Sequence, residues 1–333
     1  GKCRYNEGIH NSPDMTFKAS SDVFLKMARG EISGSEAFLK KQLIIEGDLS
    51  NMPKYNEIFL GEDNVKSDKK KLTINLSAAS NKTYFKAKSG EIKKVLAIQA
   101  SPRDTKTSKS GILLNAFLKG CEKAGATTEV IHLREKTINR CIGCYTCWTK
   151  TPGKCIYNDD VREIMLKEVN ADLVIYSIPL YHYGIYSLFK LYLERTLPRV
   201  QPYYIKNGEH ASHPVREEYK NDKRYRVIIS VAGFAEIDNF KAFSENFHML
   251  SASRHPDGIK IIAEIYRGAS EILGIEIYKN EINRVLAATE KAGIELVNNG
   301  EISSETLKDI MTVNIDIENF IKEANLYWDL CIG

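Results

Sequence analysis

Short hydrophobic runs alternate with amphipathic helical patterns over the central part of the chain. The expected strands are the β-rich runs 94–100 (KVLAIQA), 129–133, 172–178, 225–231 and 260–264. Between them, apolar residues recur with helical spacing over 108–124, 159–170, 185–196 and 239–252. Because alternating strands and helices form right-handed βαβ units, this pattern predicts a parallel sheet covered by helices on both faces.

Five strands of this kind favour a flavodoxin-like, doubly wound α/β domain with the strand order 2-1-3-4-5. In that arrangement, ligands bind beyond the carboxyl ends of strands 1 and 3. We assign this domain to residues 94–273. The remaining residues, 274–333, show helical patterns rich in Leu and Ile. We expect them to form a helical extension that packs on the domain or on a second subunit.

The N-terminal part has a shorter and less regular pattern. A helix is expected over 23–29, capped by Ser20-Ser21-Asp22 and ended by Gly30. A second short turn begins at Ser33, and the run 42–46 (QLIIE) is typical of a strand. We therefore assign residues 1–61 to a small α+β domain.

A charged and poorly periodic stretch follows this small domain. Its run 67–71 (SDKKK) is typical of a linker, and we assign residues 62–93 to it. Within the linker, 72–77 (LTINLS) and 82–88 (KTYFKAK) are expected to pair as a hairpin.

Length and composition agree with a globular protein of two domains. The chain has 333 residues, 43% of them hydrophobic and 27% charged, with a formal net charge of +4. Basic and acidic residues are mixed, which argues against nucleic acid or an anionic membrane as a partner. No apolar run approaches the roughly 20 residues that span a bilayer. We expect a cytoplasmic protein.

Four of the seven cysteines fall in one short segment, whereas Cys3, Cys121 and Cys331 are scattered. Such local clustering indicates a metal or redox site in a reducing compartment rather than a disulfide scaffold. The spacing is C-x2-C-x2-C-x7-C, formed by Cys141, Cys144, Cys147 and Cys155. Three thiolates three residues apart can wrap one corner of a [4Fe-4S] cluster, with the fourth returning after a turn. Thiols without metal, zinc and disulfides remain alternatives.

A polar loop rich in hydroxyls, 101–110 (SPRDTKTSKS), joins the first expected strand to a helix. Free N–H groups, the positive end of the helix dipole and hydroxyls together neutralise a phosphate. Neither GxGxxG nor GxxxxGK[ST] is present, which argues against a dinucleotide fold and a nucleotide triphosphatase. The loop therefore predicts a mononucleotide phosphate site.

Two further loops are expected at the same edge of the sheet. The third strand ends in a segment whose aromatic side chains can wall a planar ring. Its residues are Pro179, Leu180, Tyr181, His182, Tyr183 and Gly184. After the fourth strand, Gly233 permits close approach of the backbone to the ring. Plain packing for the tyrosines, and solvent for His182, are the alternative interpretations.

The segment 101–120 (SPRDTKTSKSGILLNAFLKG) resembles the phosphate loop of the NADPH-dependent FMN reductase and iron–sulfur flavoprotein families. The resemblance runs from about Lys94 to about Arg267. It implies that the FMN phosphate is held by Ser101, Arg103, Thr107, Ser108 and Ser110. The chain departs from the family pattern at Ala100, where Gly commonly stands.

The same families share two other segments with this chain. Their P-x-Y segment resembles the loop after the third strand, and Lys190 and Arg195 are also in place. The cysteine segment is similar to the compact motif of iron–sulfur flavoproteins, including Asp159-Asp160 after it. This resemblance implies a cluster beside FMN, although not every relative with this motif need hold one.

The N-terminal segment, with its runs 12–17 (SPDMTF), 22–31 (DVFLKMARGE) and 44–48 (IIEGD), resembles the second half of a sterol carrier protein domain. The resemblance covers about 55 residues. In that family the helices help to line a lipid tunnel. Because the first strands of the family's sheet are absent here, we expect a remnant docking domain rather than a complete tunnel.

Together these features predict an FMN-dependent oxidoreductase that takes electrons from NAD(P)H and passes them to an unknown acceptor. Since the flavin supplies the chemistry, no acid–base residue is singled out. Alternatives are a quinone or azo reductase, a non-enzymatic electron carrier, and a lipid-binding protein with a vestigial flavin domain. The exposed aromatic run Pro202-Tyr203-Tyr204 indicates a homo-oligomer, a dimer or tetramer that completes the cofactor site.

Overall fold

The computed structural model describes residues 13–47, 82–104, 107–207, 210–275, 278–313 and 317–332. The chain divides into two compact units. One comprises Gly1–Thr73, Ile275–Ile282 and Asn314–Gly333, and the other comprises Ile74–Gly274 and Asn283–Val313. Each unit is described below by itself.

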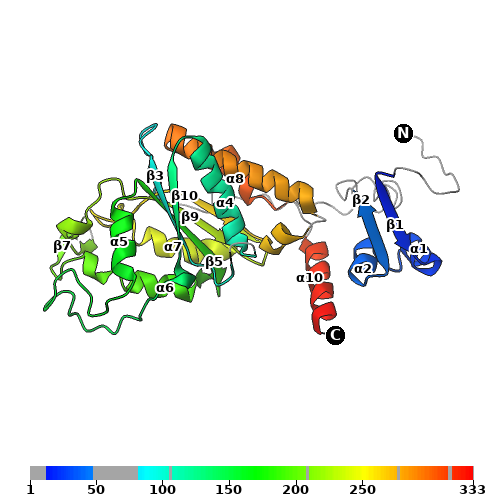
Figure 1. Ribbon diagram of the computed structural model, residues 1–333, viewed down its shortest axis with the longest axis horizontal. Coiled ribbons are helices and arrows are strands. Elements are labelled where there is room, and N and C mark those ends of the chain that lie inside the picture. The colour runs from blue at the N-terminus through cyan, green and yellow to red at the C-terminus, as the bar shows by residue number, and fades with distance from the viewer. Residues whose placement is uncertain are drawn as a thin grey trace. The chain divides into compact units, whose positions relative to one another are not determined.

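A parallel sheet forms the centre of the larger unit (Figure 1). Along the chain its strands are β3 (Lys94–Gln99), β4 (Thr127–His132), β5 (Leu173–Tyr181), β9 (Tyr225–Val231) and β10 (Lys260–Arg267). They lie in the order β4-β3-β5-β9-β10, and all four neighbouring pairs are parallel. Numbered along the chain, this is 2-1-3-4-5, so the expected flavodoxin-like topology is confirmed. A sixth, two-residue strand, β6 (Gly184–Ile185), pairs antiparallel with the end of β5.

Helices cover both faces of this sheet. Successive strand residues point to opposite sides, so each face has its own set of apolar side chains to bury. On one face, residues such as Val95 and Ala97 pack with helices α4 (Lys109–Lys123) and α8 (Lys279–Asn299). On the other face, Leu96 and its neighbours pack with three helices, α5 (Val161–Val169), α6 (Ser187–Glu194) and α7 (Lys241–His248). The result is a three-layer α/β/α core.

The helices α4 and α8 approach each other closely through two glycines. A Cβ atom at Gly120 would clash with the backbone oxygen of Glu290, and one at Gly293 would clash with that of Phe117. Buried Leu296 continues this contact between helix and core. The larger unit therefore includes most of α8, which packs on the domain as one of the two expected arrangements of the C-terminal extension.

The last two helices belong to different units. Ile310 of α9 (Ser304–Met311) is buried in the same core as α4. In contrast, α10 (Ile317–Ile332) lies in the N-terminal unit, where it contacts α2 (Gly34–Leu39).

The N-terminal unit also contains an antiparallel pair of strands and a second helix. These are β1 (Met15–Ala19), α1 (Ser21–Ala28) and β2 (Leu43–Gly47). Ser20 and Ser33 cap the two helices with their side chains, as the sequence suggested. The expected pattern lacked β1, whose half-buried residues do not alternate clearly. The small core of the N-terminal unit consists of Val23, Met27, Ala37 and Leu43.

The remaining elements are short. A hairpin of β7 (Ile205–Asn207) and β8 (His210–Ser212) precedes β9. The 3-10 turns are η4 (Leu133–Glu135), η5 (Leu197–Arg199), η6 (Glu217–Tyr219), η7 (Ile237–Phe240) and η8 (Ser270–Gly274). Residues 82–88 form no strand, and the segment 72–77 expected to pair with them lies outside the described residues. None of the described helices is both long and apolar enough to cross a membrane.

Candidate functional site

The loop after β3 leads into α4. In the sheet β3 lies between β4 and β5, which is the point where the strand order changes direction. Ser108 caps this helix, because its Oγ accepts a hydrogen bond from the Gly111 N–H at 3.0 Å. The same hydroxyl lies 3.3 Å from Ser110 Oγ and 3.3 Å from Gln99 Nε2. Ser108 and Ser110 are both buried. In the structure, these two predicted phosphate ligands hold the start of the helix together from the inside.

Thr107 is exposed in the same loop and already binds a carboxylate. Its backbone N–H and its Oγ1 both donate to Asp104 Oδ1, at 2.9 and 3.0 Å. Buried Ser101 accepts a hydrogen bond at Oγ from the Arg103 N–H at 3.1 Å. Carboxylate and phosphate oxygens require the same kind of donor. The donors of Thr107 therefore fit an anionic ligand once the Asp104 side chain moves aside.

Two cations flank this loop and share one carboxylate. Arg103 Nη1 lies 3.3 Å from Glu271 Oε1, and Lys109 Nζ lies 3.9 Å from Glu271 Oε2. With Asp104, two cations and two carboxylates lie at this loop, so a phosphate that displaces Asp104 would still meet both cations. Lys109 was not singled out in the sequence, although it stands between two of the predicted ligands.

The predicted ring-binding segment at the end of β5 is a tight hairpin. Tyr181 pairs with Gly184 across a two-residue turn, His182–Tyr183. Both turn residues have left-handed backbones, with φ of 47° and 61°, a conformation that is uncommon for bulky side chains. Such strain concentrates at functional sites. The turn holds Tyr181 and Tyr183 about half-exposed, with side chains available to a ligand.

Pro179 and Leu180, at the start of the predicted ring-binding segment, are more buried than its turn. In contrast, the third loop, at Gly233, has open space beside its backbone. Pro179 and Leu180 are half-buried in β5. A Cβ atom at Gly233 would meet no protein atom within 4 Å. Any requirement for glycine at this position would therefore come from a ligand. Next to it, Phe234 is exposed.

The four clustered cysteines line one small cavity. Cys147 is buried, Cys144 is exposed, and Cys141 and Cys155 are intermediate. Burial raises the pKa of the Cys147 thiol, and the neighbouring Cys155 and Cys144 raise it further. Hydrogen bonds from the side chain and backbone of Thr146 lower the pKa of Cys144. Across the described residues, no group of three or more His, Cys, Asp or Glu side chains is arranged to hold a metal ion.

The rest of this cysteine cavity comes from the end of α6. Arg195 lines it, and its guanidinium makes a two-pronged ion pair with Asp159, at 2.7 and 3.0 Å. Both side chains are almost fully buried, at 1% and 2% exposure. Arg195 also donates to the backbone oxygen of Asn139, just before the first cysteine. The described residues that line the cavity include none from the three loops discussed above.

Two comparisons with known families agree with the architecture. Residues 93–213 match the model of the NADPH-dependent FMN reductase family. Residues 1–60 match the model of the SCP-2 sterol transfer family. Both resemblances drawn from the sequence are thereby confirmed, each for its own segment.

Curated relatives are named iron-sulfur flavoproteins. One from Archaeoglobus fulgidus is 35% identical over 105 residues, which cover 32% of this chain and 46% of the relative. Another, from Methanocaldococcus jannaschii, is 35% identical over 114 residues, which cover 34% of this chain and 57% of the relative. The chain thus spans about half the length of these relatives.

Similar solved structures include an NAD(P)H:quinone oxidoreductase from Methanothermobacter marburgensis. It is 20% identical with a TM-score of 0.46, and the match covers 63% of this chain and 98% of that one. An FMN-dependent NADH-azoreductase from Bacillus anthracis, solved with FMN, is 19% identical with a TM-score of 0.43. That match covers 62% of this chain and 100% of the other.

Proposed function

We propose that the larger unit binds FMN at the carboxyl edge of its sheet and acts as an NAD(P)H-dependent oxidoreductase. The observation that carries this proposal is the pair of donors on Thr107, which already bind a carboxylate at the start of α4. They lie at the switch point of the strand order, where ligands of such sheets bind. The match of residues 93–213 to an FMN reductase family supports the same cofactor.

Each loop has a distinct role in this proposal. Thr107 and Ser101 donate to the phosphate, while Arg103 and Lys109 neutralise its charge. Ser108 and Ser110 hold the helix start in place rather than touching the ligand, because their hydroxyls lie within hydrogen-bond distance of each other and that of Ser108 also accepts from Gly111. The hairpin at 181–184 and the open backbone at Gly233 enclose the ring.

Bound FMN would supply the redox chemistry, since it takes up a hydride from a pyridine nucleotide and releases electrons to an acceptor. The chain's own contribution is to bind and orient the ring. The half-exposed Tyr181 and Tyr183 leave one side of the hairpin open for a donor or acceptor to approach.

We further propose that Cys141, Cys144, Cys147 and Cys155 hold one [4Fe-4S] cluster. Support comes from their spacing and from the cavity that all four line. The four thiolates would have to converge on the cluster, because the described side chains are not arranged to hold a metal ion. The names of the curated relatives agree with this assignment. Arg195 would fix the loop around the cluster, through Asp159 and the backbone of Asn139.

Assembly and location complete the proposal. Tyr203 and Tyr204 are 68% and 79% exposed, which favours a homo-oligomeric interface, a dimer or tetramer, over a solvent-facing loop. Free cysteines outside the proposed cluster, buried Cys121 and exposed Cys331, suit the reducing environment of the cytoplasm.

An ultraviolet–visible spectrum of anaerobically purified protein tests this function. Flavin bands, bleached on addition of NADH or NADPH, are the expected result, with a broad cluster absorbance beside them. A colourless protein that takes up no FMN on titration would refute the flavin assignment. Flavin bands that no pyridine nucleotide bleaches would instead identify a non-enzymatic electron carrier.

A further inference from the structure

A second cavity lies at the amino ends of β9 and β10, away from the loops assigned to FMN. It has a volume of about 410 Å³ and is lined by residues from α5, α6 and the segments that precede the two strands. Pockets for small molecules commonly have volumes of roughly 300–1,000 Å³. We call it the arginine cavity, after Arg199, Arg224 and Arg226 in its wall.

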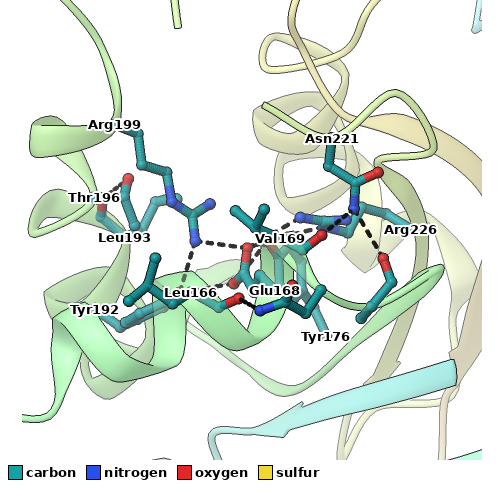
Figure 2. Close-up of polar contacts among 12 residues, drawn as sticks. Leu166, Glu168, Val169, Tyr176, Tyr192, Leu193, Thr196, Arg199, Asn221 and Arg226 are labelled. Carbon is teal, nitrogen blue, oxygen red and sulfur yellow. Dashed lines mark hydrogen bonds and ion pairs between the residues drawn. The ribbon is translucent and has the colours of Figure 1, made fainter. Parts of the chain in front are cut away.

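Part of this wall is a closed polar network around Glu168 (Figure 2). Arg199 and Arg226 approach the carboxylate from opposite sides, with Nη2 atoms 2.8 and 3.0 Å from Oε2. The hydroxyl of Tyr192 donates to its other oxygen at 2.7 Å. Burial acts to raise the pKa of Glu168, but the two arginines outweigh it and lower the pKa below its usual value. Glu168 is therefore ionised, and two arginines face one carboxylate.

Arg224 adds a third cation whose charge is weakly compensated. Its nearest carboxylate oxygen, Asp257 Oδ1, lies 3.8 Å away, and one Nη1 hydrogen bond goes to the Pro256 oxygen at 3.0 Å. Burial lowers the pKa of Arg224, and the charges of Asp257 and Asp222 offset this only in part. Its backbone is left-handed, with φ of 43°. Strain of this kind is concentrated at ligand-binding positions.

Two of these arginines also carry unsatisfied donors. Within the part of the chain that the structure describes, Arg199 Nε and Arg224 Nε are buried without a hydrogen-bond partner. An unmade hydrogen bond at a buried charged group costs free energy, so a ligand acceptor that reaches either atom would recover part of it. Eight charged residues line the cavity, four basic and four acidic, so its selectivity for an anion would come from the weakly compensated Arg224 rather than from net charge.

Aliphatic side chains line the cavity together with these arginines. They are Leu193, Leu197, Val200, Val215, Leu250 and Ile259. A fully hydrated ion such as free phosphate gains nothing from such a surface, whereas an apolar body does. Cationic donors and aliphatic side chains in the wall of one cavity are the recognition pattern for an amphipathic anion.

We propose that the arginine cavity binds a small organic carboxylate. Its anionic group would accept hydrogen bonds from Arg224 and Arg199, and its apolar body would lie against the aliphatic wall. The cavity shares no lining residue with the three FMN loops. It does share Glu194 and Leu197 with the cysteine cavity, so the ligand would lie beside the proposed cluster.

Calorimetric titration of the FMN-saturated full chain tests this proposal, with benzoate as the probe. Benzyl alcohol is the neutral analogue, and inorganic phosphate is the anion without an apolar body. We expect saturable binding of benzoate that is about tenfold or more weaker in Arg224→Gln. Arg134→Gln, which removes a cation paired with Glu135 outside the cavity, should leave binding unchanged.

A second variant and a second measurement keep the test decisive. Val215→Phe fills the aliphatic side and should weaken benzoate even if Arg224→Gln does not fold. Benzoate should also shift the methyl resonances of Val215 and Ile259 in the unsubstituted chain. Equal binding by Arg224→Gln and Arg134→Gln, or no saturable binding, would overturn the site. Tighter binding of phosphate than of benzoate would overturn the ligand class.

Discussion

The phosphate loop and the cysteine loop both follow a strand of the same sheet, but they are held in opposite ways. The phosphate loop closes on itself, because Asp104 binds Thr107 and Ser108 caps the adjacent helix. The cysteine loop is instead tied to segments that lie 49 and 66 residues away in the chain. Trp148 Nε1 donates to the Leu197 oxygen at 3.1 Å, and Tyr219 donates to the Gly153 oxygen at 3.1 Å.

This difference determines what each loop can tolerate. A self-closed loop depends on neighbours in sequence, so a substitution there changes ligand affinity and leaves the core intact. A loop held by remote side chains depends on the packing of α6 and of the segment before β9. We therefore expect changes at its anchors to affect stability first and cofactor content second.

The largest expected effect is at the buried anchor of the cysteine loop. Replacement Arg195→Leu leaves Asp159 as an unpaired buried charge, which should lower the free energy of unfolding by about 3–5 kcal/mol. The matched change Arg103→Leu removes an exposed ion pair of the phosphate loop and should cost only about 0.5 kcal/mol. Urea unfolding of both variants measures the difference. Equal losses would show that the two loops are anchored alike.

The next effect separates the two cofactors. Anaerobic protein should carry close to four irons per chain if all four cysteines bind one [4Fe-4S] cluster. Replacement Cys144→Ala should remove the iron and retain FMN, because the cysteine cavity and the FMN loops share no lining residue among the described ones. Exposed Cys331 provides the control, since Cys331→Ala should keep both.

Iron and zinc analysis, together with flavin absorbance, measures the metal and FMN content of the unsubstituted protein and of both variants. Iron below one per chain after reconstitution would end the cluster assignment. Zinc in stoichiometric amount would favour a structural metal instead. Loss of FMN together with iron in Cys144→Ala would show that the two sites are not independent.

Much of the fold could be predicted from the sequence, because the relevant signals are local. The strand 225–231 agrees with β9 residue for residue, and Ser108 and Ala124 at the limits of the expected helix are the caps of α4. The short strand β1 was not predicted, since four half-buried residues and one exposed residue carry no clear period. The split of the C-terminal helices between units depends on tertiary contacts that no period encodes.

The candidate sites likewise divide into features that the sequence predicts and contacts that only the fold creates. Ser101, Thr107 and the cysteine spacing could be identified from the sequence because each motif is contiguous. Arg195 and Asp159 were noted separately, but their ion pair spans 36 residues and no local signal joins them. Arg199, Arg224 and Arg226 likewise gave no signal, because only the fold brings these charges to one cavity.

A smaller effect is expected within the phosphate loop itself. Thr107→Ala removes a hydroxyl that we assign to the FMN phosphate, and loss of one charge-assisted hydrogen bond should weaken FMN about tenfold or more. Thr127→Ala removes a comparably exposed hydroxyl, bonded to the Lys93 oxygen at 3.2 Å at the opposite edge of the sheet. Fluorescence titration of FMN should distinguish the two variants. Unchanged affinity in Thr107→Ala would refute this assignment.

The smallest effect concerns the carboxylate that closes the loop, and it should act in the opposite direction. Asp104 Oδ1 accepts both donors of Thr107, so a phosphate must displace it before binding. Removing an exposed charge–dipole contact of this size changes a free energy by about 0.2–1 kcal/mol, so Asp104→Ala should tighten FMN up to about fivefold. Asp309→Ala removes an equal charge from an exposed position of α9 and should leave the affinity unchanged. Weaker FMN binding in Asp104→Ala alone would show that the carboxylate organises the loop for the phosphate rather than competing with it.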